Sequence, residues 1–398
     1  MKKIISTNIL FHFVSIGIIF ILLPIVLRNY SSAEVSLYTQ FAFATALMPL
    51  IDLATPRSIL LSKYFLKLNR VAEKQISSLI CVTIILSTVL AYTLNQFIYD
   101  LTTLSLILAL LSQYLLRLNV ALLDVRGRFI NANTLTLFHN LTFPAFPIMI
   151  SLLNIDLTME TSVQLQKILC IVIFFVSLPV KLHLPTLKGI RWYLRLHFKY
   201  ISNMVLITLS SNIDKLLVVL LLGDTELVAF YVVSSFVSRA KIFPDQVTRY
   251  FQANASQLRS SVGWSKLHAI YFGYTLGLLI VYQPFLAIWL EKAIAPKLFV
   301  DLIFLVLLIL PNATSQVLFS RQEFIGNSHR LIKMQLTAII GMVLLTLFLM
   351  EYLDPFIALL VAIYSRGVCE YFYLCYINKQ RMLSVTILGS AFVAYLVI

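Results

Sequence analysis

The chain consists of long apolar runs separated by short polar segments, and this pattern continues along its whole length. The runs are about 20 residues long, enough for an α-helix to cross roughly 30 Å of hydrocarbon. Because they are continuous rather than alternating, they predict membrane helices and not the strands of a barrel. Twelve helices are expected at 8–27, 37–61, 76–98, 101–123, 134–153, 165–185, 202–222, 227–248, 268–290, 298–319, 332–350 and 355–377. A thirteenth apolar stretch, 383–398, is expected either to span the membrane or to lie at its surface.

Composition and charge agree with this interpretation. Of 398 residues, 60% are hydrophobic and 12% are charged, too few for the surface of a soluble chain of this length. The net charge of +14 comes from basic residues in short loops, which argues against a nucleic-acid partner. With the N-terminus in the cytoplasm, the loops on the opposite side hold only Arg28, Lys292 and Lys297. The positive-inside rule therefore predicts a multi-pass protein of the bacterial inner membrane with a cytoplasmic N-terminus.

The sequence offers little for catalysis or metal binding. All loops are short, so no soluble domain is expected, and no G-x-x-x-x-G-K-[ST] sequence is present for nucleotide phosphates. The four cysteines fall inside apolar runs without metal-ligand spacing. We therefore expect neither catalytic residues, nor a metal, nor a cofactor other than a coupling ion, and predict that the protein is not an enzyme.

An internal repeat divides the predicted helices into two halves. An offset of 193 residues aligns Val35, Tyr38, Phe43, Asp52 and Thr55 with Val228, Tyr231, Phe236, Asp245 and Thr248. An offset of 195 aligns Arg126–Ile130, after the fourth helix, with Arg321–Ile325, after the tenth. An even number of helices per half gives a parallel repeat. The prediction is therefore two six-helix bundles, 1–200 and 201–378, around a central cavity, with a short apolar segment at 379–398.

Two stretches carry a resemblance to a known family. Leu22–Tyr30 with Glu34–Tyr38 and Ile51–Leu53 resembles the start of oligosaccharide flippases, and Ser211–Lys215 followed by Leu222–Glu226 resembles their seventh helix and the next turn. These are the Wzx-type O-antigen translocases of the MOP superfamily, which also contains lipid II flippases and MATE drug exporters. The resemblance implies transport of polyprenyl-pyrophosphate-linked glycans from cytoplasm to periplasm through a cationic cavity between two bundles. It also implies membrane lipids as partners, and the polysaccharide polymerase and chain-length machinery as candidate partners. Few glycines and the extra C-terminal segment depart from the family pattern.

Charged side chains within the apolar runs are the candidate site, because each costs about 2.5–3.5 kcal/mol at the centre of a membrane. The cations expected to bind the pyrophosphate are Lys215, Arg239, Arg366, Arg57, Arg117 and Lys241. The acids expected to take part in coupling to a proton or sodium ion are Asp52, Asp214, Asp245 and Glu370. Two structural alternatives remain open. One alternative is that basic residues extend to the cytoplasmic headgroups, namely Arg57, Arg117, Lys181 and Lys241. The other is that Arg366 and Glu370 form a pair whose charges cancel.

Other functions compete with the flippase hypothesis. A multidrug exporter for organic cations would need the opposite balance of charge. A polysaccharide polymerase or ligase would resemble chains with a large outer loop, and the predicted outer loops here are short. A metabolite transporter of another twelve-helix fold is opposed only by the two family-like stretches.

Overall fold

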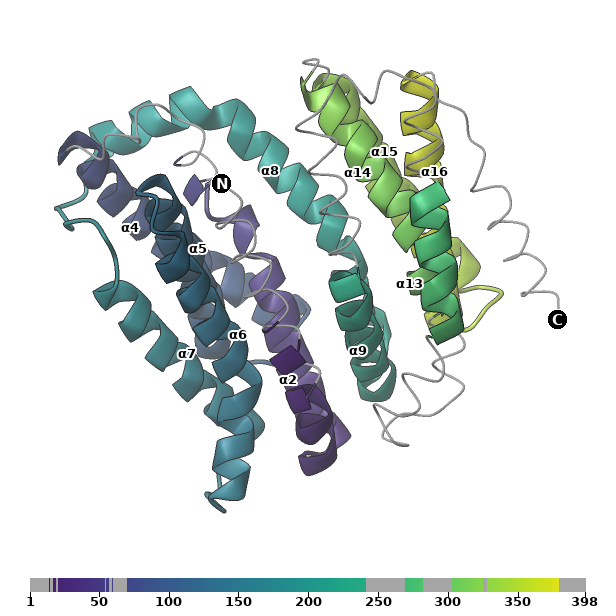
Figure 1. Cartoon of the computed structure of the whole chain (residues 1–398), viewed down its shortest axis with the longest axis horizontal. Helices are drawn as coiled ribbons and strands as arrows, with labels where there is room; N and C mark the ends of the chain where they lie inside the picture. The colour runs from purple at the N-terminus through teal and green to yellow at the C-terminus, as the bar shows by residue number, and fades with distance from the viewer. Residues whose placement is uncertain are drawn as a thin grey trace. The chain divides into compact units, whose positions relative to one another are not determined.

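A computed structural model describes residues 14, 17–18, 21–53, 55–56, 59, 70–240, 269–281, 303–324 and 328–378. All regular elements in these residues are helices (Figure 1). The chain divides into two units, Met1–Leu220 and Leu221–Ile398. The boundary expected between residues 200 and 201 lies inside one continuous helix, which ends at Leu221.

The first unit is built around one central helix, α5. Residues 21–29 are helical, and the elements that follow are α2 (Ser32–Ala46), the 3-10 helix η1 (Met48–Leu50), α4 (Arg70–Phe97), α5 (Thr103–Val125), α6 (Phe129–Leu152), α7 (Met159–Val176) and α8 (Leu187–Leu221). Helix α5 packs against α2, α4, α6 and α7, and about two thirds of its apolar window is buried (67%). Residues on α5 therefore reach the interior of this unit.

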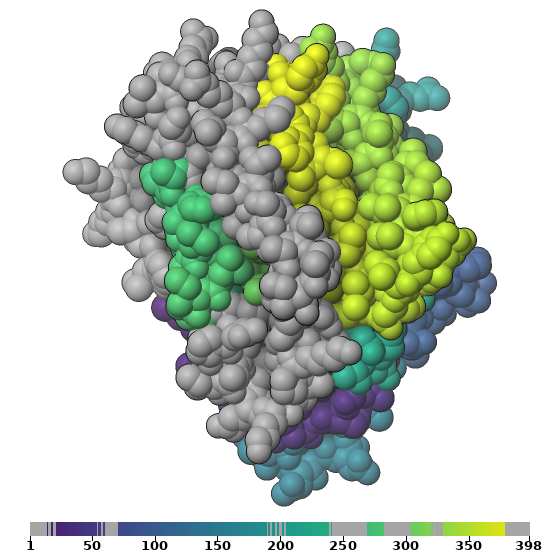
Figure 2. Space-filling model, turned by 90° about the vertical axis from the view of Figure 1, so that its right-hand side faces the viewer, coloured from purple at the N-terminus to yellow at the C-terminus, as the bar shows by residue number. Residues whose placement is uncertain are grey.

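The second unit is organised around its last described helix. Its elements are α9 (Asp224–Ala240), the apolar helix Ala269–Val281, α13 (Ile303–Leu307), α14 (Ile309–Phe324), α15 (Ser328–Leu349) and α16 (Pro355–Ile377). Helix α16 packs against α13, α14 and α15. Figure 2 shows α15 and α16 side by side, in lime and yellow.

Among the described residues, seven helices are long and apolar enough to cross a membrane. Large apolar side chains lie exposed on their outer faces, as hydrocarbon requires; Val176 on α7 is 82% exposed and Phe97 on α4 is 75% exposed. The prediction of an all-α, multi-pass membrane protein is confirmed.

Side-chain caps fix where several helices begin. The hydroxyl of Ser31 accepts a hydrogen bond from the N–H of Glu34, and the Glu34 carboxylate accepts one from the N–H of Ser31. Thr102 and Thr158 cap α5 and α7 through their side-chain oxygens. These polar starts precede the apolar residues, so hydropathy places the starts of the second and sixth predicted helices too late.

The predicted helix 165–185 is wrong at both ends. Helix α7 ends at Val176, and the chain from Ser177 to Thr186 is not helical, because Pro179 and Pro185 interrupt it. Side chains of α4 form hydrogen bonds with the backbone of this segment. The hydroxyl of Ser78, for example, accepts a hydrogen bond from the N–H of Thr186 at 2.8 Å. The next helix, α8, then begins at Leu187, well before the predicted start at 202.

Repeat-related positions have similar burial in the two units. Val35 and Val228 are buried, as are Tyr38 and Tyr231, and Phe43 and Phe236. The second repeated motif differs between the units. Arg126–Arg128 forms the turn between α5 and α6, whereas Arg321 and Gln322 lie inside α14, which continues to Phe324. The expectation that both motifs follow a helix is therefore wrong for the second.

Glycine explains the difference at this motif. Gly127 has a φ of +71°, a left-handed conformation that terminates α5. The N–H of Gly127 donates to the Asp124 carbonyl and that of Arg128 donates to the Leu123 carbonyl, both at 2.9 Å. The equivalent Gln322 is buried, and its side chain donates to Asn378 Oδ1 at 2.9 Å. Without a glycine there, the helix continues.

We predict that Gly127→Ala lowers the free energy of unfolding by about 1–2 kcal/mol, because a Cβ is disfavoured at positive φ. The apparent melting temperature of the purified protein in detergent measures this change. Gly341→Ala is the matched control, since a Cβ at either position meets no atom within 4 Å. Because Gly341 is inside α15, its replacement is expected to be neutral or to raise the melting temperature. Equal effects of the two substitutions would contradict the role given to Gly127.

Candidate functional site

Helix α2 breaks inside the first unit, at the acidic residue singled out from the sequence. The helix ends at Ala46, and η1 begins with Pro49 in its first turn. Asp52 follows in a turn, and Leu53 has a φ of +50°. The continuous helix predicted over 37–61 is therefore wrong. Pro49 has no N–H for the helical hydrogen-bond pattern, and the chain does not resume that pattern before Leu53.

The break leaves backbone groups of α2 without helical partners, and α8 provides partners for two of them. The amide of Asn212 donates to the Ala46 carbonyl at 3.3 Å, and the hydroxyl of Tyr193 donates to the Leu53 carbonyl at 3.0 Å. Irregular backbone is tolerated within a membrane only where protein or a water-filled cavity surrounds it. The interaction with α8 thus maintains the break as a defined structure.

Lys215 extends this network. Its Nζ donates to Asn212 Oδ1 at 2.7 Å, one turn away on the same helix. A chain of hydrogen bonds therefore runs from Lys215 through Asn212 to the end of α2. Asp214, the adjacent acid, forms no ion pair with Lys215 in the part of the chain that the structure describes. Asp214 Oδ1 is buried there without a hydrogen-bond partner.

Asp52 and Arg117 form an ion pair at the same break. The distance from Arg117 Nη1 to Asp52 Oδ2 is 3.4 Å, and the aspartate side chain is 1% exposed against 32% for the arginine. The same guanidinium nitrogen lies 3.7 Å from Met48 Sδ in η1. Arg117 comes from the central helix α5, so the ion pair connects that helix to the broken segment.

A second ion pair lies in the second unit. Arg366 Nε is 3.4 Å from Glu370 Oε1, one turn away on α16, and both side chains are largely buried. Arg366 Nη1 also lies 3.6 Å from Met342 Sδ on α15. Beside the pair, Gly367 brings α16 close to Leu308, since a Cβ at this position would lie 2.5 Å from Leu308 Cδ2. Arg366 and Glu370 thus form the ion pair that the sequence analysis gave as an alternative to a role in binding.

The structure describes little or nothing of the remaining predicted site residues. Arg239 lies in α9, and its side chain is outside the description. Arg57, Lys241 and Asp245 lie outside the described residues. The structure therefore brings Asp52, Arg117 and Lys215 to the break in α2, whereas Arg366 pairs with Glu370 in the second unit. Their roles in binding and coupling stay predictions, as does the central cavity.

The sequence analysis missed a buried lysine. Lys167 on α7 is 1% exposed, and its Nζ lies 4.3 Å from the centre of the Phe143 ring on α6. This distance is typical of a cation–π interaction. His139 is buried in the same unit, and its Nδ1 has no hydrogen-bond partner in the described structure. The predicted helix 165–185 placed Lys167 near a membrane surface, whereas the observed bounds place it mid-helix.

A metal centre finds no support in the described part of the chain, where no group of three or more His, Cys, Asp or Glu side chains is suitably arranged. The candidate residues instead form one ion pair in each unit, and in the first unit Lys215 and Lys167 form no ion pair with a described carboxylate. All of these residues except Asp52 lie within candidate membrane spans.

Comparison with solved structures identifies the fold. The lipid II flippase MurJ, in an inward closed conformation, is 16% identical with a TM-score of 0.64 over 94% of this chain and 88% of that chain. An inward-facing MATE family multidrug resistance transporter of the MOP superfamily is 11% identical, with a TM-score of 0.62 over 92% and 93%. A MOP superfamily transporter from Pyrococcus furiosus, described as having a binding pocket of reverse polarity, is 12% identical with a TM-score of 0.51 over 94% of each chain. No family profile and no curated protein sequence matches. The chain thus shares the fold of MOP-superfamily transporters.

We predict that Asp52 and Arg117 stabilise each other by about 1 kcal/mol, a value typical of a partly exposed ion pair. The melting temperatures of Asp52→Asn, Arg117→Gln and the double variant form a double-mutant cycle that measures this coupling. The Arg117 substitution is expected to cost less in the Asp52→Asn background. Arg195→Gln, at an exposed position of α8, is the control and should add independently to Asp52→Asn. Additive effects of the first two substitutions would disprove the coupling.

Lys167→Met is expected to leave the melting temperature unchanged or to raise it. Replacing a buried charge with an apolar side chain of similar volume removes a desolvation penalty. Lys167→Ala should lower the melting temperature, because it leaves a cavity. If Lys167→Met destabilises the protein as much as Lys167→Ala does, then the charge itself stabilises the fold, and the buried lysine needs no functional explanation.

Proposed function

We propose that this protein is a flippase that moves polyprenyl-pyrophosphate-linked oligosaccharides, such as O-antigen repeat units for lipopolysaccharide, across the bacterial inner membrane. In this proposal the N-terminus and the basic loops are cytoplasmic, and the cargo passes to the periplasmic leaflet by alternating access. The polysaccharide polymerase and the chain-length machinery would act on the exported unit.

The environment of Lys215 is the observation that carries this proposal. Its ammonium group donates to an amide oxygen and forms no ion pair with a described carboxylate, and only the adjacent Asp214 adds a favourable charge interaction among the described acids. A pyrophosphate is a suitable ligand for such a charge at membrane depth, because hydrogen bonds between ionised groups are about twice as strong as neutral ones. We assign Lys215, Arg239, Arg366, Arg57, Arg117 and Lys241 to pyrophosphate binding.

The acidic residues supply a hypothesis for coupling. Asp52, Asp214, Asp245 and Glu370 are proposed to take up and release a proton or a sodium ion during transport. Asp52 is the strongest of these candidates, because it lies at the break in α2 and interacts with Arg117. Neutralising Asp52 would weaken that interaction and allow the broken segment to rearrange. Such a rearrangement would connect ion binding to the conformational cycle.

Similarity to a lipid II flippase supports the lipid-linked cargo, and similarity to a MATE transporter at nearly the same TM-score supports an alternative. In that alternative the protein exports drugs or metabolites. The sign of the charge favours the flippase: Lys215 and Lys167 lack carboxylate partners in the described structure, which would disfavour organic cations.

The proposal is tested by following the lipid-linked repeat unit in cells that lack the gene and have no second flippase. Loss of surface polysaccharide with accumulation of the complete unit on the cytoplasmic leaflet would support it. Arrival of the unit on the periplasmic leaflet without polymerisation would instead favour a polymerase or ligase. Unchanged surface polysaccharide would favour drug or metabolite export.

We predict that Lys215→Ala and Arg239→Ala abolish export while the protein remains inserted in the membrane. Loss of one ionic hydrogen bond is expected to weaken cargo binding about 10- to 100-fold, which leaves too little export to restore surface polysaccharide. Smaller effects are expected for Arg57→Ala and Arg117→Ala, because these side chains lie nearer the cytoplasmic ends of their predicted helices. The measurement is restoration of surface polysaccharide in the deletion strain, with membrane levels of each variant compared by immunoblot.

Two further variants sharpen this test. Lys215→Arg keeps the charge and should retain part of the activity. Lys181→Ala removes an exposed lysine from the segment between α7 and α8 and should export normally. Normal export by both Lys215→Ala and Arg239→Ala would disprove the cationic-cavity mechanism.

A further inference from the structure

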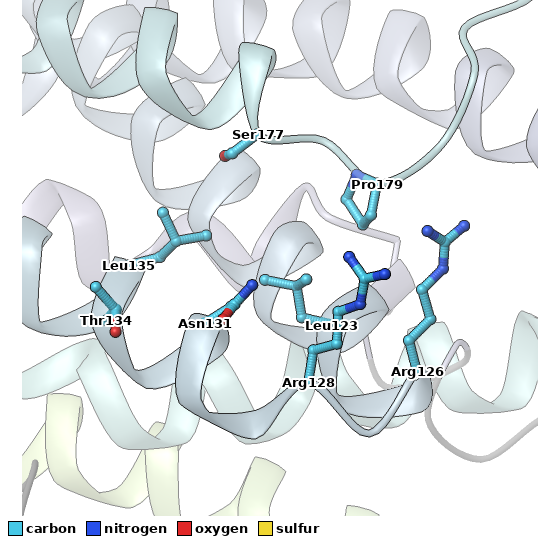
Figure 3. Close-up of a pocket in the computed structure, with 8 residues that line it drawn as sticks. All are labelled: Leu123, Arg126, Arg128, Asn131, Thr134, Leu135, Ser177 and Pro179. Carbon is cyan, nitrogen blue, oxygen red and sulfur yellow. The ribbon is translucent and has the colours of Figure 1, made fainter.

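The turn between α5 and α6 presents two arginines on either side of a glycine. The left-handed conformation of Gly127 closes the end of α5, so that Arg126 and Arg128 flank the turn. Figure 3 shows both side chains extending toward the segment that contains Pro179. Both residues are exposed, and neither forms an ion pair with any described residue. Two positive charges thus lie close together, and no described carboxylate forms an ion pair with either.

A pocket with a volume of about 390 Å³ lies beside these arginines, entirely within the first unit. Arg126, Arg128 and Asn131 line one side, and Ser177 and Pro179, which follow α7, line another (Figure 3). The wall therefore offers two guanidinium groups and one amide, together with the hydroxyls of Thr134 and Ser177. The guanidinium groups and the amide can donate hydrogen bonds to phosphate oxygens, whereas the two hydroxyls already donate to the backbone carbonyls of Ile130 and Phe174.

Exposed apolar side chains lie next to the pocket-lining residues in sequence, at the ends of two candidate membrane spans. Val172, Phe175 and Val176, in the last turns of α7, are 54%, 45% and 82% exposed. Ile130, in the first turn of α6, is 62% exposed. Apolar side chains exposed at the ends of membrane-spanning helices contact acyl chains, so the pocket lies where hydrocarbon meets water. A ligand in this position would have both an anionic group and a lipid tail.

We propose that this pocket binds the phosphate group of an anionic phospholipid in the leaflet on its own side of the membrane. Arg126 and Arg128 would hold the phosphate oxygens, and the Asn131 amide would donate a further hydrogen bond. The positive-inside pattern places this turn on the cytoplasmic side, where anionic lipids are attracted to basic residues. The inference goes beyond the proposed transport function, since lipid binding at this pocket is measurable whether or not the protein moves any cargo.

Native mass spectrometry of the full-length protein in detergent tests the proposal, with phosphatidylglycerol as the probe. The variant Arg126→Gln/Arg128→Gln is expected to bind phosphatidylglycerol about tenfold more weakly than the unaltered protein. Lys188→Gln/Arg191→Gln removes the same charge from exposed positions on α8 and is expected to change binding less than about twofold. Equal weakening in both variants, or none in the first, would overturn the proposal.

A second variant guards against misfolding as an explanation. Asn131→Asp places a carboxylate in the first turn of α6, where an acid favours the helix but repels a phosphate. It is expected to keep the melting temperature and to lose phosphatidylglycerol binding; retained binding would count against the site.

Two further probes identify the source of the phosphate. Displacement of phosphatidylglycerol by millimolar inorganic phosphate, or binding of a polyprenyl pyrophosphate alone, would overturn the assignment to a phospholipid.

Discussion

The ion pair between Asp52 and Arg117 lies where α2 breaks and its backbone groups lose their helical partners. Hydrocarbon offers no polar partners, so a helix that breaks within a membrane must find hydrogen bonds inside the protein. Here α5 contributes Arg117, and α8 contributes Asn212 and Tyr193. The break therefore aligns three helices with one another. A shift of α8 by one turn would remove both of its hydrogen bonds to α2, so the polar interactions set a register that apolar packing alone leaves less defined.

The internal repeat shows which parts of this architecture are shared by the two units. Aligned positions on α2 and α9, such as Tyr38 and Tyr231, are buried in both. The repeated motif then diverges at one position, where Gly127 ends α5 and Gln322 allows α14 to continue. This one difference thus accounts for a sharp turn after α5 in the first unit and for a helix that runs through the equivalent position in the second. The arginine-lined pocket belongs to the first unit because the turn that forms it requires the glycine.

Hydropathy predicted the existence of the helices well and their ends less well. The helix at 355–377 has the predicted bounds, because Asp354 caps it and Pro355 begins it where the apolar run starts. In α7, by contrast, the polar cap at Thr158 precedes the apolar window, and prolines end the helix early. The resulting error concealed Lys167, which looked like a surface lysine. The break in α2 depends on Pro49 and on side chains of α8, which are distant in sequence and invisible to an average over neighbouring residues.

The described cations at membrane depth fall into two kinds. Arg117 and Arg366 each contact a carboxylate and a methionine sulfur, so their charges are largely balanced within the fold. Lys215 and Lys167 contact an amide and an aromatic ring, which solvate a cation without cancelling its charge. Removing water from an ion costs several kcal/mol, and a protein that needed only stability would place apolar side chains at these positions. In the proposed flippase an anionic cargo would complete the neutralisation at Lys215, which sets this cation apart from Arg117 and Arg366, whose charges the fold already balances.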